Sequence, residues 1–300
     1  MDQVANQYQS PQVCPLCDDA GACSSWLGST TYRDRRFCYV QCLNCSSLYC
    51  APMPDLATLT AMYGTDYSTG FSQDTHIDDP KEPGRVLNYL KLAPPGVFLD
   101  FGCGIGSLLT GAIERGWHAI GIEFDPRVVH EVEERTGAKV VAYDDQESLG
   151  PPVADVLHLG DVLEHLTDLN SQMPAILRLL KPGGILLAQG PLENNGNLFV
   201  WVMQMGRKFR PARQTQMAPY HVMLATAQGQ LALFQRFGLE TIEFDLTEVS
   251  WPAPARISPR NFLNPRRAGL YVLRRCSRML SSLRPKHWGN RYFYVGRQST

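Results

Sequence analysis

Two carboxylates flank a run of glycines at a spacing that suits a nucleotide ligand. Residues 97–101 form an apolar run typical of a buried strand, alternating glycines follow it, and a helical pattern begins at Ser107. Such a turn brings backbone N–H groups close to a ligand. Asp100 lies two residues before the first glycine, Gly102, and Glu123 ends the next apolar run. We predict that Glu123 binds the two hydroxyls of a ribose, as a carboxylate about 20 residues after such a turn does in nucleotide-binding units.

Asp100 indicates which nucleotide the turn binds. A dinucleotide would place its pyrophosphate at the helix N-terminus, where the Asp100 carboxylate would repel it. S-Adenosylmethionine has no phosphate, and it carries an ammonium and a sulfonium group that the same carboxylate would attract. The order of the glycines also fits Gly-x-Gly-x-Gly better than the dinucleotide pattern. The residues predicted to bind S-adenosylmethionine are Asp100, Gly102, Cys103, Gly104, Gly106, Glu123, Phe124, Asp144, Asp145 and Gly160.

Strand and helix patterns alternate regularly from residue 97 onward, which predicts a parallel sheet covered by helices. The third strand ends at Asp144 and Asp145, which either meet the adenine amino group or form an Asx turn. The predicted fold class is α/β, a doubly wound, Rossmann-like sheet of seven strands. These strands are expected at residues 97–101, 117–124, 139–143, 154–160, 185–189, 239–249 and 292–295.

Seven of the nine cysteines lie before residue 51. Four of them form two Cys-x-x-Cys pairs, which are Cys14–Cys17 and Cys42–Cys45. Each pair supplies two thiolates from one turn, and four sulfurs complete a tetrahedral site with no open position, which suits a structural zinc ion. Disulfide bonds are the alternative, and Cys38 could replace one of the four ligands. We predict a zinc-ribbon module over residues 1–54 that depends on its metal, because so short a segment builds little core of its own.

The composition disfavours several classes of protein. The chain has 300 residues, of which 44% are hydrophobic, so it is long enough for about two domains and a large core. Its net charge of −1 disfavours a general polyanion binder. The basic residues of the N-terminal module are one small group, Arg33, Arg35 and Arg36, so nucleic acid is an unfavoured partner. There is no signal-peptide pattern and no apolar stretch that spans a bilayer, and we expect a cytoplasmic protein with reduced thiols.

The glycine turn resembles the first motif of class I S-adenosylmethionine-dependent methyltransferases. The run Asp-Val-Leu-Glu-His at 161–165 and the Lys-Pro-Gly-Gly run at 181–184 resemble the same family. With the cysteine pairs and the segment around His221, the chain is similar to zinc-bearing methyltransferases of sugars and secondary metabolites. This likeness implies O-methylation of a small molecule, sugar or lipid-linked metabolite. C-methylation of a nucleotide sugar is one alternative, and an RNA-binding module or RNA methyltransferase is another.

The resemblance also implies which residues meet the methyl acceptor. Sugar C-methyltransferases of this kind usually carry an acidic residue just before the second histidine, where Tyr220 stands, so O-methylation is favoured. In one arrangement a histidine is a metal-free general base and a tyrosine orients the acceptor. The residues expected at the acceptor are His221, His165, Tyr67, Tyr63 and Glu164.

In a second arrangement, a Mg²⁺ or Mn²⁺ ion lowers the pKa of the acceptor hydroxyl, as in the resembling Glu-x-x-Glu-His…His methyltransferases. The ligands would be Asp161, Glu164, His165 and His221. A helix that begins at Asp161 would place the first three of these on one face. The third interpretation is structural, with Glu164 merely bracing that helix.

The remaining stretches are assigned by their composition. Residues 197–205 are unusually apolar, and they belong to a segment, residues 191–222, that we expect to form a lid. Residues 251–300 hold ten arginines, one lysine and no acidic residue. We expect residues 266–284 to form an amphipathic helix that either contacts an anionic membrane surface or packs on its own sheet. The predicted plan is a helical linker with a substrate-side loop at 55–95, and a catalytic domain at 96–300 with a basic helical insertion at 251–290.

Overall fold

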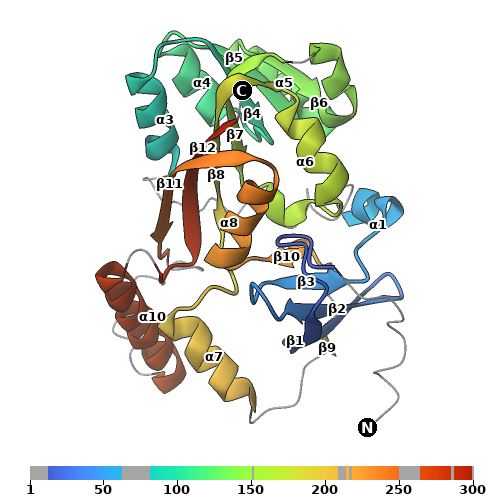
Figure 1. The fold of residues 1–300 in the computed structure, drawn as a ribbon, viewed down its shortest axis with the longest axis vertical. Coiled ribbons are helices and arrows are strands. Elements are labelled where there is room, and N and C mark those ends of the chain that lie inside the picture. Colours follow the sequence, from blue (N-terminus) through green and yellow to red (C-terminus); the bar gives the residue numbers. More distant parts are fainter. Residues whose placement is uncertain are drawn as a thin grey trace.

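The protein contains a seven-stranded sheet wrapped by helices and a five-stranded sheet beside it (Figure 1). The structure is a computed structural model that describes residues 13–62, 82–150, 152–208, 214–215, 218–249, 264–284 and 287–298. The large sheet has the strand order β11–β12–β8–β7–β4–β5–β6. Its strands are β4 (Val97–Phe101), β5 (His118–Glu123), β6 (Lys139–Ala142), β7 (Ala154–Gly160), β8 (Leu180–Pro191), β11 (Leu239–Thr247) and β12 (Arg291–Gln298).

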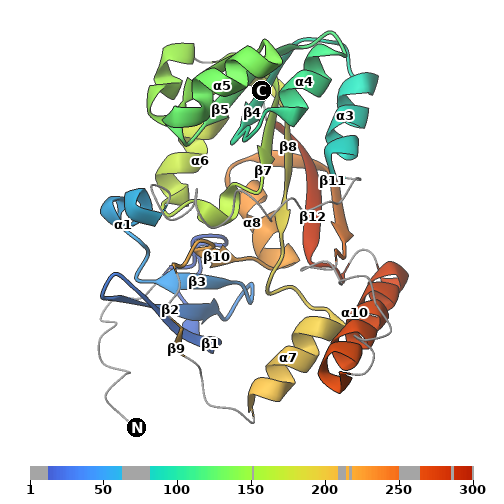
Figure 2. The same ribbon diagram turned by 180° about the vertical axis from the view of Figure 1, so that it is seen from behind.

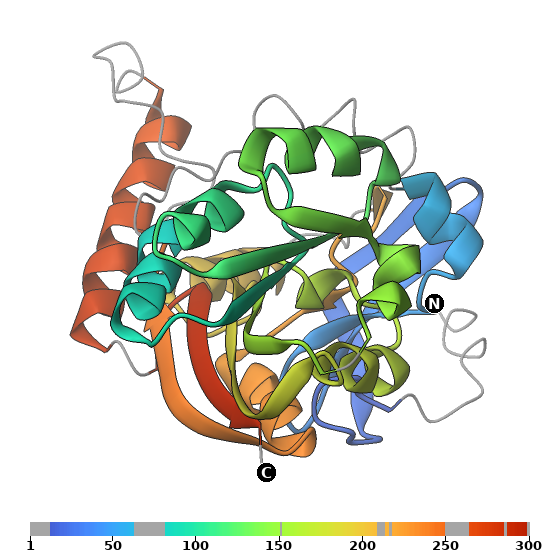
Figure 3. The same cartoon turned by 90° about the horizontal axis from the view of Figure 1, so that it is seen from above.

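The large sheet is parallel except at β12, which pairs antiparallel with both β8 and β11. Helices cover both of its faces (Figure 3). Because successive strand residues point to opposite sides, Phe98 lies in an apolar core with residues of three helices, and its neighbour Leu99 lies in a second core with residues of two others. The first three helices are α3 (Glu82–Leu92), α4 (Ser107–Ile113) and α5 (Pro126–Thr136), and the other two are α6 (Leu169–Leu177) and α8 (Ala227–Arg236). The predicted doubly wound α/β fold with seven strands is therefore confirmed.

Residues from two distant parts of the chain build the small sheet (Figure 2). Its strand order is β10–β3–β2–β1–β9. These strands are β1 (Ala22–Tyr32), β2 (Arg35–Cys42), β3 (Leu48–Ala51), β9 (Gln214–Thr215) and β10 (Met223–Leu224). The N-terminal module thus shares its sheet with the segment that follows β8, which the expected boundary at residue 54 leaves out.

The local structure differs from expectation at the end of β7. No helix begins at Asp161, because that residue takes a left-handed φ of 52° and its N–H still donates to the Gln189 carbonyl at 3.0 Å. A single 3₁₀ turn, η3 (Leu163–His165), follows, and α6 begins only after Asp168, whose carboxylate accepts from the Ser171 N–H. Strand β8 is also longer than the strand expected at residues 185–189, since it includes residues 181–184.

The described part of the chain also contains three helices that are not part of the two layers covering the large sheet, and a 3₁₀ segment after β6. They are α1 (Leu56–Ala61), α7 (Leu198–Lys208), α10 (Pro265–Leu283) and η2 (Tyr143–Leu149). Helices α7 and α10 lie side by side, away from the strands of the large sheet (Figure 1, Figure 2). None of the helices in the described part of the chain is long and apolar enough to cross a bilayer.

Candidate active site

The glycine turn between β4 and α4 has the conformation that a close backbone approach requires. Gly102, Gly104 and Gly106 take φ values of 80°, 51° and 77°, which disfavour any residue with a side chain. At Gly102 there is also no room for one, since a Cβ there would lie 2.9 Å from Cγ2 of Val162. The turn is therefore shaped by its glycines and packed against the chain that leaves β7.

Glu123 holds this turn from the neighbouring strand β5. Its Oε2 accepts a hydrogen bond from the Gly104 N–H at 2.8 Å, and its Oε1 accepts from the N–H groups of Phe124 at 2.7 Å and Asp125 at 3.1 Å. The carboxylate predicted to bind a ribose thus lies directly over the middle glycine. The arrangement orients both oxygens by backbone donors, which is what a bidentate contact to two hydroxyls needs.

Asp100 lies beneath the turn and has a partner that the sequence did not indicate. Its Oδ1 is 2.7 Å from Nδ1 of His158 on β7, and both side chains are buried. Asp100 and His158 are direct neighbours in the β4–β7 register. Nε2 of His158 has no hydrogen-bond partner among the described residues. The predicted contact between Asp100 and the ammonium of the cofactor stays a prediction, and the histidine holds the carboxylate in place for it.

Aromatic rings form the outer part of the predicted cofactor site. Phe124 follows β5 and stacks on Tyr143 after β6, with ring centroids 4.3 Å apart and planes inclined by 24°. Apolar, flat surfaces of this kind suit an adenine ring. Asp144 and Asp145 follow on η2 and are both exposed. Cys103 differs from the others, since its side chain is buried and would touch any side chain placed at Gly121 of β5.

The histidines expected at the acceptor come together beside the glycine turn. Strands β4 and β7 are neighbours, so the chain leaving β7 passes Gly102 at Val162 and reaches His165 three residues later. The rings of His165 and His221 meet edge to face with centroids 4.9 Å apart. One ligand-type atom from each of Glu164, His165 and His221 lies within 4.8 Å of the other two. Distant segments therefore converge on one cluster, which we call the histidine site.

Each ring of the histidine site is oriented through its Nδ1 atom. The Nδ1–H of His165 donates to the Tyr220 carbonyl at 2.8 Å, and the Nδ1–H of His221 donates to Oε2 of Glu193 at 2.8 Å. Glu193 follows β8, two residues beyond its carboxyl end. The carboxylate that contacts His221 thus comes from Glu193 and not from the residue before the histidine. The Nδ1 atom of each ring is therefore engaged, and Nε2 of His165 lies 4.0 Å from Oε1 of Glu164.

The charges of the histidine site are uneven. Burial and the charge of His221 lower the pKa of His165 to about 4. Burial acts to lower the pKa of His221 as well, but the hydrogen bond and the charge of Glu193 outweigh it and raise that pKa to about 9. Burial and the charge of Asp161 raise the pKa of Glu164 to about 8. Near pH 7, His165 is therefore neutral, His221 is charged, and Glu164 is largely protonated.

Asp161 does not belong to this cluster, although the sequence placed it there. Its Oδ2 lies 2.9 Å from the guanidinium of Arg291, a buried residue on β12. The left-handed backbone at Asp161 aims the side chain toward β12 rather than along a helix face. Among the described residues, the candidate ligand set for a divalent ion is therefore Glu164, His165 and His221 without the aspartate.

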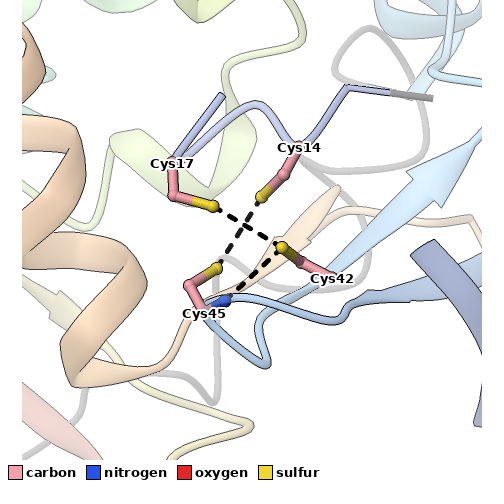
Figure 4. Close-up of side chains that lie close together, drawn as sticks. All are labelled: Cys14, Cys17, Cys42 and Cys45. Atoms are coloured by element: carbon pink, nitrogen blue, oxygen red, sulfur yellow. Dashed lines mark hydrogen bonds between the residues drawn. The ribbon is translucent and has the colours of Figure 1, made fainter. Parts of the chain in front are cut away.

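The four cysteines predicted to bind zinc form a compact cluster in the N-terminal module (Figure 4). The Sγ atoms of Cys14 and Cys45 are 3.8 Å apart, and those of Cys17 and Cys42 are 3.5 Å apart. A tetrahedral site with Zn–S bonds of about 2.3 Å has edges of about 3.8 Å, so the sulfurs are spaced as this ion requires. All four are free thiols rather than disulfides. Cys38 is not part of the cluster.

The cysteine cluster is joined to α8 of the catalytic domain. The Thr226 hydroxyl, which caps α8, donates to the carbonyl of Cys45 at 2.6 Å, and the Thr226 N–H donates to the Ser47 hydroxyl at 3.0 Å. Gly229 allows this approach, because a Cβ there would lie 2.2 Å from Oγ of Ser47 and 3.1 Å from Sγ of Cys45. The module and the helix are thus in direct contact at the cysteines.

The same module holds the backbone of the His221 segment. Strand β10 pairs with β3, the Cys50 N–H donates to the Val222 carbonyl at 2.8 Å, and the hydroxyl of Tyr39 donates to the His221 carbonyl at 2.7 Å. On the other side, the Val222 N–H donates to the Glu164 carbonyl at 2.9 Å. The segment that carries His221 therefore bridges the small sheet and the turn after β7.

Sequence reasoning missed four residues of the site. Tyr63 and Tyr67 lie outside the described residues. The missed residues are His158, Glu193, Tyr143 and Tyr39. Glu193 and Tyr143 each follow the end of a strand. The prediction of Asp144 used the same position in the sequence, so these two residues could have been predicted in the same way. For Tyr39, which is 182 residues from its partner, no local signal exists.

Comparison with known proteins points to one family. A family model described as a methyltransferase domain matches residues 76–243. The ubiquinone biosynthesis O-methyltransferase of Xanthomonas campestris pv. campestris is 29% identical over 209 residues, which cover 62% of this chain and 84% of that protein. The trans-aconitate 2-methyltransferase of Methylobacterium nodulans is 32% identical over 109 residues, which cover 35% of this chain and 42% of that protein.

A solved structure with a similar fold is that of the 1,6-didemethyltoxoflavin-N1-methyltransferase of Burkholderia thailandensis. The TM-score is 0.53 with 16% sequence identity, and the match covers 89% of this chain and 97% of the other. At this identity the likeness concerns the fold alone.

Proposed function

Because this chain belongs to the family of S-adenosylmethionine-dependent methyltransferase domains, we propose that it methylates a hydroxyl group of a small molecule. The observation that carries the proposal is the contact between the two halves of the site. The glycine turn with Glu123 and the histidine site lie on neighbouring strand ends, joined where Val162 packs on Gly102. Methyl transfer requires the donor and the acceptor to lie side by side, and the contact between these two groups of residues allows that.

The residues of the glycine turn fit S-adenosylmethionine. Glu123 and the Phe124–Tyr143 pair offer a carboxylate for the ribose and a flat apolar surface for the adenine. Asp100, oriented by His158, offers a negative charge to the ammonium end. When bound, S-adenosylmethionine supplies the methyl group. The task of the remaining residues is to position the acceptor and to take up its proton.

We assign the proton-accepting role to Nε2 of His165. Its Nδ1–H donates to the Tyr220 carbonyl, and burial lowers the pKa of His165 to about 4, so at pH 7 the ring is neutral and its Nε2 carries a lone pair. Such a ring is a weak base, but the acceptor oxygen becomes strongly acidic as it gains the methyl group, and its proton then passes to Nε2. His221 is charged and paired with Glu193, and it serves to attract and orient an oxygen that carries partial negative charge. The relative from Xanthomonas campestris is named as an O-methyltransferase, which agrees with an oxygen acceptor.

A divalent ion at the histidine site is the second candidate mechanism. It is favoured by the three ligand-type atoms of Glu164, His165 and His221 and by the anchored Nδ1 atoms, an arrangement that metal-binding histidines use. The metal-free mechanism is preferred because Glu193 holds His221 in its charged form, in which Nε2 carries a proton and binds no metal. Nε2 of His165 and Oε1 of Glu164 are 4.0 Å apart, which is wider than the spacing of about 3 Å between adjacent ligands of an octahedral Mg²⁺ or Mn²⁺ ion and suits opposite ligands only. The cysteine sulfurs, in contrast, already have the spacing of their ion.

We propose that the four cysteines hold a structural zinc ion that keeps the small sheet folded. The spacing of the sulfurs and their burial support this, and a closed set of four thiolates leaves no position for a substrate. Because the same module holds the backbone at His221 and directly after it, the zinc would affect the reaction only through the position of this segment.

The test is a screen for methyl acceptors with labelled S-adenosylmethionine and mixed small metabolites that bear hydroxyl groups. The wild-type protein is expected to transfer label to an oxygen, and His165→Gln is expected to lower kcat on that acceptor by about 10²- to 10⁴-fold. Arg178→Gln, a change on the exposed surface, serves as the control. Transfer to carbon or nitrogen alone, or undiminished turnover in His165→Gln, would show that the proposed chemistry is wrong.

Chelation separates the two mechanisms. The enzyme is treated with EDTA, its zinc content is checked, and activity is measured before and after addition of Mg²⁺ or Mn²⁺. The metal-free mechanism predicts unchanged activity while the zinc content stays constant. A loss that Mg²⁺ or Mn²⁺ restores would replace it with the divalent-ion mechanism.

A further inference from the structure

Helices α7 and α10 form a pair with a defined inner face (Figure 2). The Phe199 N–H of α7 donates to the Ser277 hydroxyl of α10 at 3.2 Å, and the guanidinium of Arg274 lies over the Phe199 ring at 5.3 Å from its centroid. Ser277 and Ser281 are the most buried residues of α10, and the Ser281 hydroxyl bonds to Glu248. The face of α10 that looks toward the protein therefore contains these two serines, and Leu273, Cys276 and Leu280 of the same helix are half-buried.

Both helices of the pair expose large apolar side chains, and we call the surface that these side chains form the outer face. On α10, Val272, Met279 and Leu283 are 52%, 59% and 71% exposed. They are spaced by seven and four residues, which places them on one stripe, opposite to Ser277. On α7, Trp201 is 58% exposed and Met205, one turn later, is 37% exposed. Single exposed apolar residues are ordinary on a protein surface, but stripes on two adjacent helices indicate an interaction site.

The charge of α10 narrows the kind of partner. The helix carries five arginines and no acidic residue, and the whole of residues 251–300 holds ten arginines and one lysine without an Asp or Glu. The net charge of the chain is only −1, so this basic character is concentrated in one region. Arg275 and Arg278 are exposed beside the outward stripe. A partner that satisfies both features presents negative charge above an apolar layer.

We propose that the α7–α10 pair docks on an anionic lipid bilayer, with Trp201, Met279 and Leu283 in the interfacial layer and the arginines at the lipid headgroups. Basic amphipathic helices bind such surfaces through apolar burial added to charge attraction. A nucleic acid would use the arginines but leave the Trp, Met and Leu side chains in water. Helix α7 follows β8 in the sequence, and Glu193, which contacts His221, lies in the short connection between them. The proposed membrane-binding helices are therefore joined directly to a segment of the histidine site.

The proposal is tested by co-sedimentation of the full chain with vesicles of phosphatidylcholine alone and of phosphatidylcholine with 30% phosphatidylglycerol. We expect at least tenfold stronger binding to the anionic vesicles, weakened by 0.5 M NaCl. The apolar variant Val272→Ser/Met279→Ser/Leu283→Ser and the charge variant Arg275→Glu/Arg278→Glu are each expected to lose binding at least tenfold. Neither variant alters residues assigned to the cofactor, so S-adenosylmethionine binding should be unchanged and reports intact folding.

The control variants make the same kinds of substitution at exposed positions outside α7 and α10. Leu92→Ser and Ile242→Ser remove exposed apolar side chains from α3 and β11, and Lys91→Glu/Lys139→Glu changes the net charge by the same amount as the arginine variant. These controls should bind vesicles as the wild type does. The proposal is overturned if anionic vesicles are not bound, or if the controls weaken binding equally. Self-association through the outer face or binding of RNA, with no vesicle binding, would replace it by a protein or nucleic-acid partner.

Discussion

Glu193 and His221 form a hydrogen-bonded pair across two segments that the chain brings together at the end of β8. The Nδ1–H of the histidine donates to the carboxylate at 2.8 Å, and roughly two-fifths of the Glu193 side chain remains exposed. The pair makes the two histidines unlike each other, since His221 is held as a cation and His165 is held neutral. The division of roles within the histidine site rests on this relationship.

Removal of the carboxylate is expected to reverse the shift of His221. In the protein freed of divalent ions, the His221 ring should titrate well above pH 6.5, because Glu193 favours its charged form. In Glu193→Gln the charge is lost while burial remains, so the pKa of His221 should fall by at least one unit. NMR titration of the histidine ring signals measures this without any knowledge of the acceptor. An unchanged pKa in the variant would show that Glu193 does not set the charge of His221, and Glu240→Gln, on β11, is the control.

Glu123→Gln is expected to weaken binding of S-adenosylmethionine. The variant keeps the shape of the side chain but loses the charge that the predicted ribose contact uses. Hydrogen bonds to a charged group contribute about 1.5–3 kcal/mol, which corresponds to an increase in Kd of roughly 10- to 150-fold. Isothermal titration calorimetry measures the change. Glu134→Gln on the exposed face of α5 should bind as the wild type does. Equal affinity of Glu123→Gln and Glu134→Gln would remove Glu123 from the site.

Gly229→Ala is expected to separate the cysteine cluster from α8. An added methyl group has no room beside Ser47 and Cys45, so the helix and the module must move apart, at a cost of about 1–3 kcal/mol in the free energy of unfolding. The matched change Gly269→Ala, in α10 with open space around it, should be neutral or stabilising by up to about 1 kcal/mol. Thermal unfolding compares the two variants. If both have the Tm of the wild type, the contact at Gly229 is not needed for stability.

Metal analysis of the purified protein is expected to give about one zinc ion per chain. Cys42→Ser should lose the metal and lower the Tm, because a structural zinc site contributes its binding free energy to folding. The exposed Cys23, which lies outside the cluster, provides the control as Cys23→Ser. Full zinc content in Cys42→Ser, or an unchanged Tm after the metal is removed, would contradict a structural zinc at these four cysteines.

Much of the architecture was set by local sequence. Periodic apolar residues indicated all seven strands of the large sheet, and the glycines marked the turn after β4. These signals are local because a strand end or a positive φ depends on a few neighbouring residues. The two Cys-x-x-Cys pairs likewise predicted a compact group of sulfurs, since each pair places its thiols within one turn.

Tertiary structure alone decided what each functional residue contacts. Asp161 and Glu164 stand three apart in the sequence, but a left-handed residue at the end of β7 sends the first to Arg291 and buries the second beside two histidines. Glu193 reaches His221, and Tyr39 holds the same segment from the small sheet. A hydrogen bond between residues far apart in the chain depends on how whole strands are ordered and paired. Residue spacing within one segment carries no information about that order, and so the chemistry of the histidine site could be read only from the folded chain.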